Sequence, residues 1–276
     1  MRSGGGETAA KWRAAYASVI GQAHLNQKTE CQDRFICRTI ETKAGEILIA
    51  VVADGAGSAE KGHVGAQTAC ELFAGEIAVF LQNENASVKS LNKDFGRRWI
   101  SYFRHKIAEI AGRDGAEIRE YASTLVAAVA GEAQAAFYQI GDGAVVFSAF
   151  GETETYRFGI QPAETLYVNE TDFLTDDDAA AKIRFESVEE TVEDLILFSD
   201  GIFPVAVNYQ TNQPHAPFLK PMLAPLRNGN PPDGLNAKLE NFLASSKINE
   251  KTDDDKTIIL ASRHKARAAI KIEQHL

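Results

Sequence analysis

Aspartate recurs at the ends of apolar, strand-like runs of this sequence. Asp54 and Asp200 close the runs ILIAVVA and LILFS, each followed by glycine, and Asp142 lies in the turn Ile-Gly-Asp-Gly between two further apolar runs. A triplet of aspartates, 253–255, stands just before the run TIILA. A carboxylate at the end of a buried strand is held on a rigid element, and a following glycine permits a sharp turn or the close approach of a ligand. One Asp-Gly step is an ordinary turn, but this recurrence predicts carboxylates that converge at the ends of sheets.

Converging carboxylates repel one another unless a cation lies between them. Hard oxygen ligands select Mg²⁺, Mn²⁺ or Ca²⁺ over zinc or copper, so the pattern predicts a divalent-cation site. Bound cations also invert the local charge, and such a site could therefore bind a phosphorylated substrate.

The segments that must position these aspartates have strand and helix character in turn. Near-continuous apolar residues predict a strand buried on both faces at 46–53. Apolar residues spaced by three and four predict helices over 65–81 and 99–110. Further strands are predicted at 16–20, 34–40, 123–130, 135–140, 144–150, 153–158, 182–186, 195–198 and 256–261, and a late helix from 233 with Leu235, Leu239, Phe242 and Leu243 on its inner face.

Strands before and after a central pair of helices predict an α+β fold in which two sheets are sandwiched between helices. No linker divides the chain, so we expect one domain over 12–263. The segment 1–11 is expected to be disordered or a tag, and 264–276 a C-terminal tail.

Composition narrows the classes of function. The 276 residues carry a formal net charge of −9, which disfavours nucleic-acid binding because that role needs a basic stripe. Three cysteines without a C-x-x-C pair favour a reducing cytoplasm and exclude a Cys-rich zinc site. The longest apolar runs, 47–53 and 125–130, are far shorter than the ~20 residues that span a bilayer. We therefore expect a cytoplasmic protein with no membrane or nucleic-acid partner, and we take it to be a monomer.

Six short motifs, taken in order, resemble the metal-dependent protein phosphatase family, the protein phosphatase 2C type. The resemblance is closest to a compact bacterial branch that opens like Gly21-Gln22-Ala23-His24 followed by Cys31-Gln32-Asp33. It covers residues 14–262 and implies a four-layer αββα sandwich, with two antiparallel sheets flanked by helices. The motifs are Gln32-Asp33, VADGAGS (52–58), Ser123-Thr124-Leu125, IGDG (140–143), FSDG (198–201) and DDDKT (253–257).

The resemblance implies two Mg²⁺ or Mn²⁺ ions at one end of the sandwich. Asp54 matches the aspartate that bridges both metals, and Gly55 the residue that lends a backbone carbonyl. Asp200 and Asp254 match two further ligands of the first metal, and Asp33 an acidic residue that acts directly or through water. We expect Asp54, Asp200 and Asp254 to carry catalysis.

Other acidic positions have further counterparts. Asp142 matches an aspartate that many bacterial members use, with Asp200, for a third and weaker metal. Asp255 stands where the family commonly has Asn. The stretch NETDFLTDDD, 169–178, falls where relatives carry a mobile flap beside the site, although an acidic solvated loop is the simpler interpretation.

Three positions depart from the family's pattern. Gln32 replaces a frequent Glu that helps to bind the second metal, which would then depend more on its remaining ligands and water. Ala56 replaces the histidine proposed in eukaryotic members to protonate the leaving group. Bulk water, or a water on the third metal, would have to supply that proton, since His63 is more simply a surface or capping residue. Lys28, five residues before Asp33, stands at the position of a phosphate-gripping Arg and could bind substrate, without Arg's bidentate fork.

The implied activity is hydrolysis of phosphoserine and phosphothreonine in proteins. Two divalent cations neutralise the four charges of Asp33, Asp54, Asp200 and Asp254. Two metals about 3.5–4 Å apart can share a water, lower its pKa and direct it at phosphorus, so that no covalent phosphoenzyme is needed. Phosphorylated proteins and a cognate Ser/Thr kinase are the expected partners.

A second class of function stays open, a weakly active or inactive phosphatase-like domain that binds a phosphoprotein or a kinase. Gln32 and Ala56 favour it, whereas the retained carboxylates argue against it, because an inactive site gains nothing from their repulsion.

Other phosphatase and nucleotide-binding classes fit this sequence poorly. A Cys followed six residues later by Arg, which thiol phosphatases need, is absent, as are the glycine patterns of nucleotide binders. The stretch Asp253-x-Asp255-x-Thr257 resembles an aspartyl-nucleophile motif of haloacid-dehalogenase-type phosphatases, but it is C-terminal and follows a polar segment.

Overall fold

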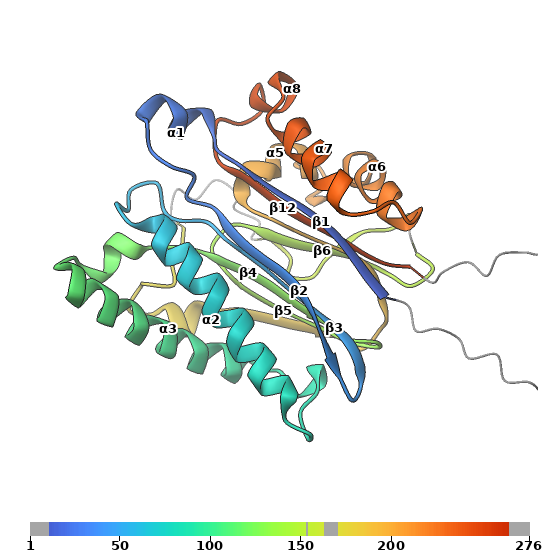
Figure 1. Cartoon of the computed structure of the whole chain (residues 1–276), viewed down its shortest axis with the longest axis horizontal. Coiled ribbons are helices and arrows are strands. Elements are labelled where there is room, and N and C mark those ends of the chain that lie inside the picture. Colours follow the sequence, from blue (N-terminus) through green and yellow to red (C-terminus); the bar gives the residue numbers. More distant parts are fainter. Residues whose placement is uncertain (1–10, 153, 163–170, 265–276) are drawn as a thin grey trace, which may run out of the picture.

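Two five-stranded antiparallel sheets face each other between helices (Figure 1). The computed structural model describes residues 11–152, 154–162 and 171–264. In the first sheet the order is β1 (Lys11–Val19), β12 (Lys256–His264), β9 (Val192–Phe198), β6 (Ala144–Ala149) and β7 (Arg157–Phe158). In the second it is β2 (Arg34–Thr42), β3 (Gly45–Ala53), β4 (Leu125–Ala130), β5 (Ala135–Ile140) and β8 (Arg184–Val188). The predicted α+β sandwich of two antiparallel sheets is confirmed.

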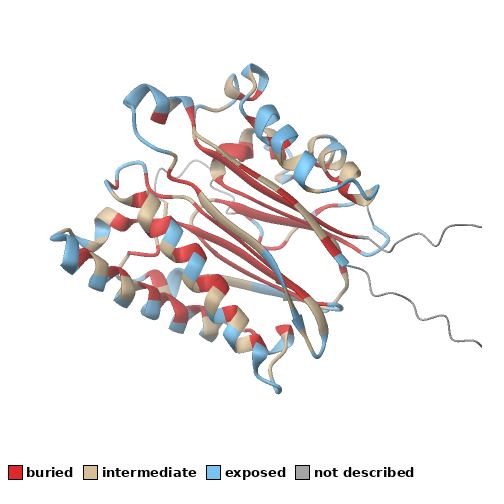
Figure 2. Ribbon diagram, in the orientation of Figure 1, coloured by how far each residue is buried: buried red, intermediate tan, exposed pale blue. Residues whose placement is uncertain are grey.

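Alternation of side chains along the strands produces the layers. In β3, Ile49 and Val51 pack with the core formed by the second sheet, α2 (Gly62–Gln82) and α3 (Lys93–Asp114). The intervening Ala50 and Val52 pack between the two sheets. Successive strand residues point to opposite faces, so one apolar run fills two layers of the core, which Figure 2 shows as buried strands inside exposed helix faces.

The other side of the sandwich is covered by α6 (Ala216–Arg227) and α7 (Asp233–Leu243). The sequence gives little sign of α6, because Pro221 and Pro225 stand inside it, and proline removes a backbone donor and clashes with the preceding turn. Its buried residues are Leu219, Leu223 and Leu226, so an apolar stripe at helical spacing holds the helix against the sheet.

Short elements connect the layers. The helices are α1 (Gln22–Gln27), α4 (Ala179–Lys182), α5 (Phe203–Ala206) and α8 (Ser246–Asn249), and β10 (Val207–Asn208) pairs with β11 (Gln213–Pro214). Turns of 3-10 helix span Val88–Ser90, Ile118–Tyr121 and Asp200–Ile202.

Several predicted boundaries differ from the observed ones. β1 begins at Lys11 rather than 16, and only Arg157–Phe158 of the strand predicted at 153–158 pairs as a strand, residue 153 lying outside the described residues. β8 begins at Arg184 because the residues before it form α4. On α7, Leu239 and Leu243 are buried as predicted, whereas Phe242 is 37% exposed and stacks obliquely on Phe218.

By length and composition α2 is the one helix of the described ranges that could cross a membrane. Of its most apolar stretch, 44% is buried inside the fold, and its buried face packs on the second sheet. The core helix of a folded domain has these properties as well.

Candidate active site

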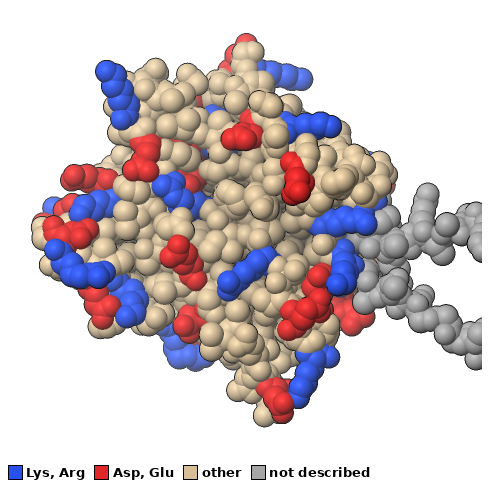
Figure 3. Space-filling model, in the orientation of Figure 1, with Lys and Arg blue, Asp and Glu red and all other residues tan. Residues whose placement is uncertain are grey.

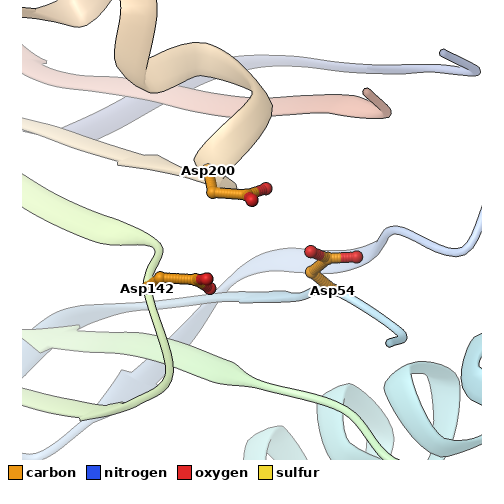
Figure 4. Close-up of side chains that lie close together, drawn as sticks. All are labelled: Asp54, Asp142 and Asp200. Carbon is orange, nitrogen blue, oxygen red and sulfur yellow. The ribbon is translucent and has the colours of Figure 1, made fainter. Parts of the chain in front are cut away.

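Three aspartates from three parts of the chain meet at one end of the sandwich (Figure 4). Asp54 follows β3, Asp142 lies in the turn between β5 and β6, and Asp200 opens the 3-10 turn after β9. One carboxylate oxygen of each lies within 4.8 Å of those of the other two. The structure thus brings together residues that are separated by up to 146 positions, the distance in sequence from Asp54 to Asp200.

A cavity of about 420 Å³ opens over these carboxylates. Asp254 and Gly55 line it with them, while Asp33 lies buried beside it at 2% exposure and accepts a hydrogen bond of 2.6 Å from the Ser199 hydroxyl. The lining residues are Ala23, His24, Gln27, Asp54, Gly55, Ala56, Gly57, Thr124, Asp142, Thr171, Phe173, Asp200, Asp253 and Asp254.

Burial and mutual repulsion hold these carboxyl groups toward their protonated form. Burial raises the pKa of Asp54 well above its usual value, and the charges of Asp33, Asp200 and Asp254 raise it further. The pKa of Asp200 is likewise raised by burial and then by the charges of Asp142, Asp254 and Asp33. Burial raises the pKa of Asp33 to about 6, against hydrogen bonds from Ser199 and Thr257 that lower it. Without a counter-cation the ionised cluster is therefore costly.

The donor set fits divalent cations of the Mg²⁺ and Mn²⁺ kind. All the converging side chains offer carboxylate oxygen, which these ions prefer. Oδ1 of Asp33 and Oδ1 of Asp200 are buried and accept no hydrogen bond, although buried polar atoms are normally paired. Cations bound at this end would satisfy both oxygens and cancel the repulsion.

The backbone around Asp54 is fixed by the neighbouring strand. The Thr124 hydroxyl accepts a hydrogen bond of 3.0 Å from the Asp54 amide, and the Thr124 amide donates 2.8 Å to the Asp54 carbonyl. Gly55 approaches α2 so closely that an added Cβ would lie 2.4 Å from the carbonyl carbon of Gly62. This crowding accounts for glycine after the aspartate.

Gln32 is buried against the Gly55 turn. One end of its side-chain amide faces two acceptors, 2.7 Å from the Gly55 carbonyl and 2.8 Å from the Ala56 carbonyl, so we assign the nitrogen to this end, from which it donates to both. The carbonyl of Gly55, which the resemblance makes a metal ligand, is thereby held in place by a neutral side chain.

Asp255, 1% exposed, lies outside the lining of the cavity and binds the N-terminal part of the chain. Its carboxylate accepts hydrogen bonds of 2.7 Å from the backbone amide of Gly21 and 2.6 Å from the backbone amide of Gln32. It also lies 2.9 Å from Nδ1 of His24. Burial alone would raise its pKa, but these three partners outweigh burial and lower it. Motif spacing does not predict this role of Asp255, although the segment that Asp255 binds includes the Gly21–His24 opening of the resemblance.

Lys28 and His63 lie outside the lining of the cavity. Lys28 ends α1 in the left-handed conformation, with φ 59°, and its side chain is exposed. Gln27, one residue earlier, lines the cavity instead. His63 lies near the start of α2, where Nε2 is 3.3 Å from Glu30. Among the described residues the cavity has no Lys or Arg.

The described part of the predicted flap, 171–178, is anchored on both sides. Thr171 donates 2.7 Å from its hydroxyl to Asp142 Oδ2. Arg104 of α3 donates to the carbonyls of Thr175 and Asp176. Thr175 is buried, so this stretch is more than a solvated acidic loop. Residues 169 and 170 lie outside the described residues.

Comparison with known proteins gives the family of this arrangement. The family model described as Protein phosphatase 2C matches residues 20–244. Serine/threonine-protein phosphatase 3 of Escherichia coli (strain K12) is 30% identical over 253 residues, which cover 91% of this chain and 98% of that protein.

Solved structures with this fold include bacterial phosphatases. A crystal structure of a bacterial serine phosphatase aligns with a TM-score of 0.60 at 16% identity, covering 94% of this chain and 100% of that one. Serine/threonine phosphatase Stp1 from Staphylococcus aureus aligns with a TM-score of 0.59 at 15% identity, covering 95% and 99%. At these identities the likeness concerns the fold.

Proposed function

We propose, because this chain belongs to the protein phosphatase 2C family, that it hydrolyses phosphoserine and phosphothreonine in proteins with the help of divalent metal ions. The observation that carries the proposal is the convergence of Asp54, Asp142 and Asp200, whose oxygens lie within 4.8 Å of one another. Asp254 lines the same cavity, which leaves an open, oxygen-rich site for a phosphate ester.

Two Mg²⁺ or Mn²⁺ ions would be held by Asp54, Asp200, Asp254 and the Gly55 carbonyl, with Asp33 acting directly or through water. When bound, these ions supply Lewis-acid activation of water and stabilise the charge on the phosphate. The chain itself fixes the ligands through the Thr124 contacts described above. No Lys or Arg among the described residues lines the cavity, so this proposal relies on the cations for most of the attraction toward phosphate.

A third and weaker cation would use Asp142 together with Asp200. The Thr171 hydroxyl occupies one oxygen of Asp142, which leaves the other for a ligand. Fewer protein oxygens at this position support a lower affinity than at the paired sites.

The test is phosphate release from a phosphothreonine peptide with and without Mn²⁺. Asp54→Asn and Asp200→Asn should each lower kcat at least about a hundredfold, since loss of one ligand charge removes on the order of 3 kcal/mol of transition-state stabilisation. Asp233→Asn is the matched control, because Asp233 is an exposed Asp-Gly residue at the start of α7 outside the cavity lining. Near wild-type rates in either site variant would contradict the assignment. Inactivity of the wild-type protein with Mn²⁺ would instead favour the binding-only alternative.

We take the partners of this protein to be phosphorylated proteins and the Ser/Thr kinase that phosphorylates them. On the face drawn in Figure 3, Lys and Arg are interspersed with Asp and Glu, which supports a protein rather than a nucleic-acid substrate. Free Cys31, Cys37 and Cys70 support a reducing, cytoplasmic location. The exposed large apolar side chains lie on different segments, which supports a monomer; they are Leu25, Val79, Tyr102, Phe150, Tyr209 and Phe242.

A further inference from the structure

We propose that His24 is a further catalytic residue, which donates a proton to the serine or threonine oxygen as the phosphate ester breaks. The proposal rests on the phosphatase function proposed above. His24 lines the cavity together with Asp54, Asp200 and Asp254, and is itself only 8% exposed. An imidazole thus stands in the same chamber as the carboxylates that would hold the cations.

Few of the described cavity residues could donate this proton. The alkoxide of serine or threonine is a poor leaving group, so its departure is assisted by a proton donor. Asp54, Asp142, Asp200 and Asp254 would hold the cations, and the side chains of Gln27, Thr124 and Thr171 do not exchange protons near neutral pH. Asp253 and His24 are then the ionisable lining side chains that hold no cation in this proposal. The remaining described lining residues are alanine, glycine and phenylalanine. Imidazole is the side chain that most often serves as a general acid.

The ring of His24 lies with one nitrogen against a buried carboxylate. Nδ1 is 2.9 Å from Asp255 Oδ1, within ion-pair distance. Asp255 is itself held by the amides of Gly21 and Gln32. The amide of Ala23 donates 2.9 Å to the Asp253 carbonyl and anchors the start of α1. Within the described residues nothing hydrogen bonds to Nε2, and this nitrogen is left for a group in the cavity.

The proposed step balances as follows. A water oxygen forms the new bond to phosphorus, and the bond between phosphorus and the ester oxygen breaks with its electron pair on that oxygen. The ester oxygen takes the proton from Nε2 and leaves as the alcohol. The proton released by the attacking water passes to solvent, and His24 takes up a proton again before the next turnover.

The experiment compares two leaving groups in the presence of Mn²⁺. The alkoxide of a phosphothreonine peptide needs a proton, whereas the nitrophenolate of p-nitrophenyl phosphate leaves without one. His24→Gln keeps a hydrogen bond to Asp255 within reach and should lower kcat on the peptide by about 10²–10⁴, the usual contribution of a general acid. On p-nitrophenyl phosphate the loss should stay below about threefold.

His63→Gln is the matched control, since that histidine pairs with Glu30 outside the cavity lining, and both activities should remain at the wild-type level. Equal losses of kcat in His24→Gln on both substrates, or no loss on the peptide, would overturn the proposal.

If His24→Gln does not fold, the wild-type protein provides the test with a series of substituted phenyl phosphates. A shallow dependence of kcat/KM on leaving-group pKa is expected, and a steep one would overturn the proposal. If the wild-type protein releases no phosphate from any substrate, the phosphatase function fails and the role of His24 fails with it.

Discussion

Asp33→Asn should remove a large part of the pH dependence of stability in the metal-free protein. Burial raises the pKa of Asp33 from its usual value of 3.8 to about 6. At ~1.4 kcal/mol for each pKa unit, the difference corresponds to about 3 kcal/mol. The folded state holds this proton more tightly than the unfolded state does. The stabilisation is therefore fully present below the unfolded pKa and is lost as the pH rises through about 6.

About 2 kcal/mol of this loss falls between pH 4.5 and pH 7.5, which for a domain of this size corresponds to roughly 4–8 °C in Tm. The measurement is thermal unfolding in EDTA across that range, with the wild-type protein and Asp33→Asn side by side. The variant loses a charge at a site where Ser199 donates a hydrogen bond. We therefore expect a constant difference in Tm between the two proteins, and this difference does not test the prediction. The test is whether the Tm of the wild-type protein falls toward pH 7.5 more steeply than the Tm of the variant. Parallel curves would refute the raised pKa of Asp33 on which this prediction depends. Mn²⁺ added at pH 7.5 should recover the lost wild-type stability, because binding to the folded state shifts the unfolding equilibrium.

Three further outcomes follow from packing and burial. Gly65→Ala should cost about 1–3 kcal/mol in urea denaturation, since its Cβ would lie 2.0 Å from the Tyr121 carbonyl oxygen. Gly75→Ala, on the same helix with nothing within 4 Å of the new Cβ, should instead stabilise by up to about 1 kcal/mol. Burial raises the pKa of the Cys37 thiol from 9.0 to about 12, so a smaller fraction of Cys37 is in the reactive thiolate form at pH 8. Its alkylation by iodoacetamide, followed by mass spectrometry, should be roughly a thousandfold slower in the folded protein than after unfolding.

The layers of the fold could be predicted because their cause is local. The run that became β3 is short, apolar at successive positions and rich in β-branched residues, which is typical of a strand covered on both faces. Spacings of three and four residues marked α2 and α3 for a similar reason. α6 escaped prediction because the prolines argue against a helix locally, while the packing of Leu219 and Leu223 under the helix, which outweighs them, depends on a distant sheet.

Spacing along the chain brought Asp54, Asp142, Asp200 and Asp254 to one cavity, whereas Lys28 lies outside its lining. Asp54 and Asp200 each follow a strand directly, so their direction is fixed by the strand. Lys28 is separated from β2 by a loop and belongs to the end of a six-residue helix. The distance of five residues from Asp33 therefore carries no information on where its side chain lies.

The acidic triplet shows what residue type alone leaves open. Asp254 and Asp255 are identical in chemistry and adjacent in sequence, yet one lines the cavity while the other binds the amides of Gly21 and Gln32. Both residues lie just before β12, with Asp254 in a bend, and the backbone there directs the two side chains differently. The Gln32 contact with Asp255 comes from the backbone amide, which a residue of any type at position 32 would supply. The side chain at 32 and the carboxylate at 255 therefore depart from the family's pattern independently. Residue type predicts a carboxylate here, whereas only the local backbone decides whether it meets the cavity or the N-terminal segment.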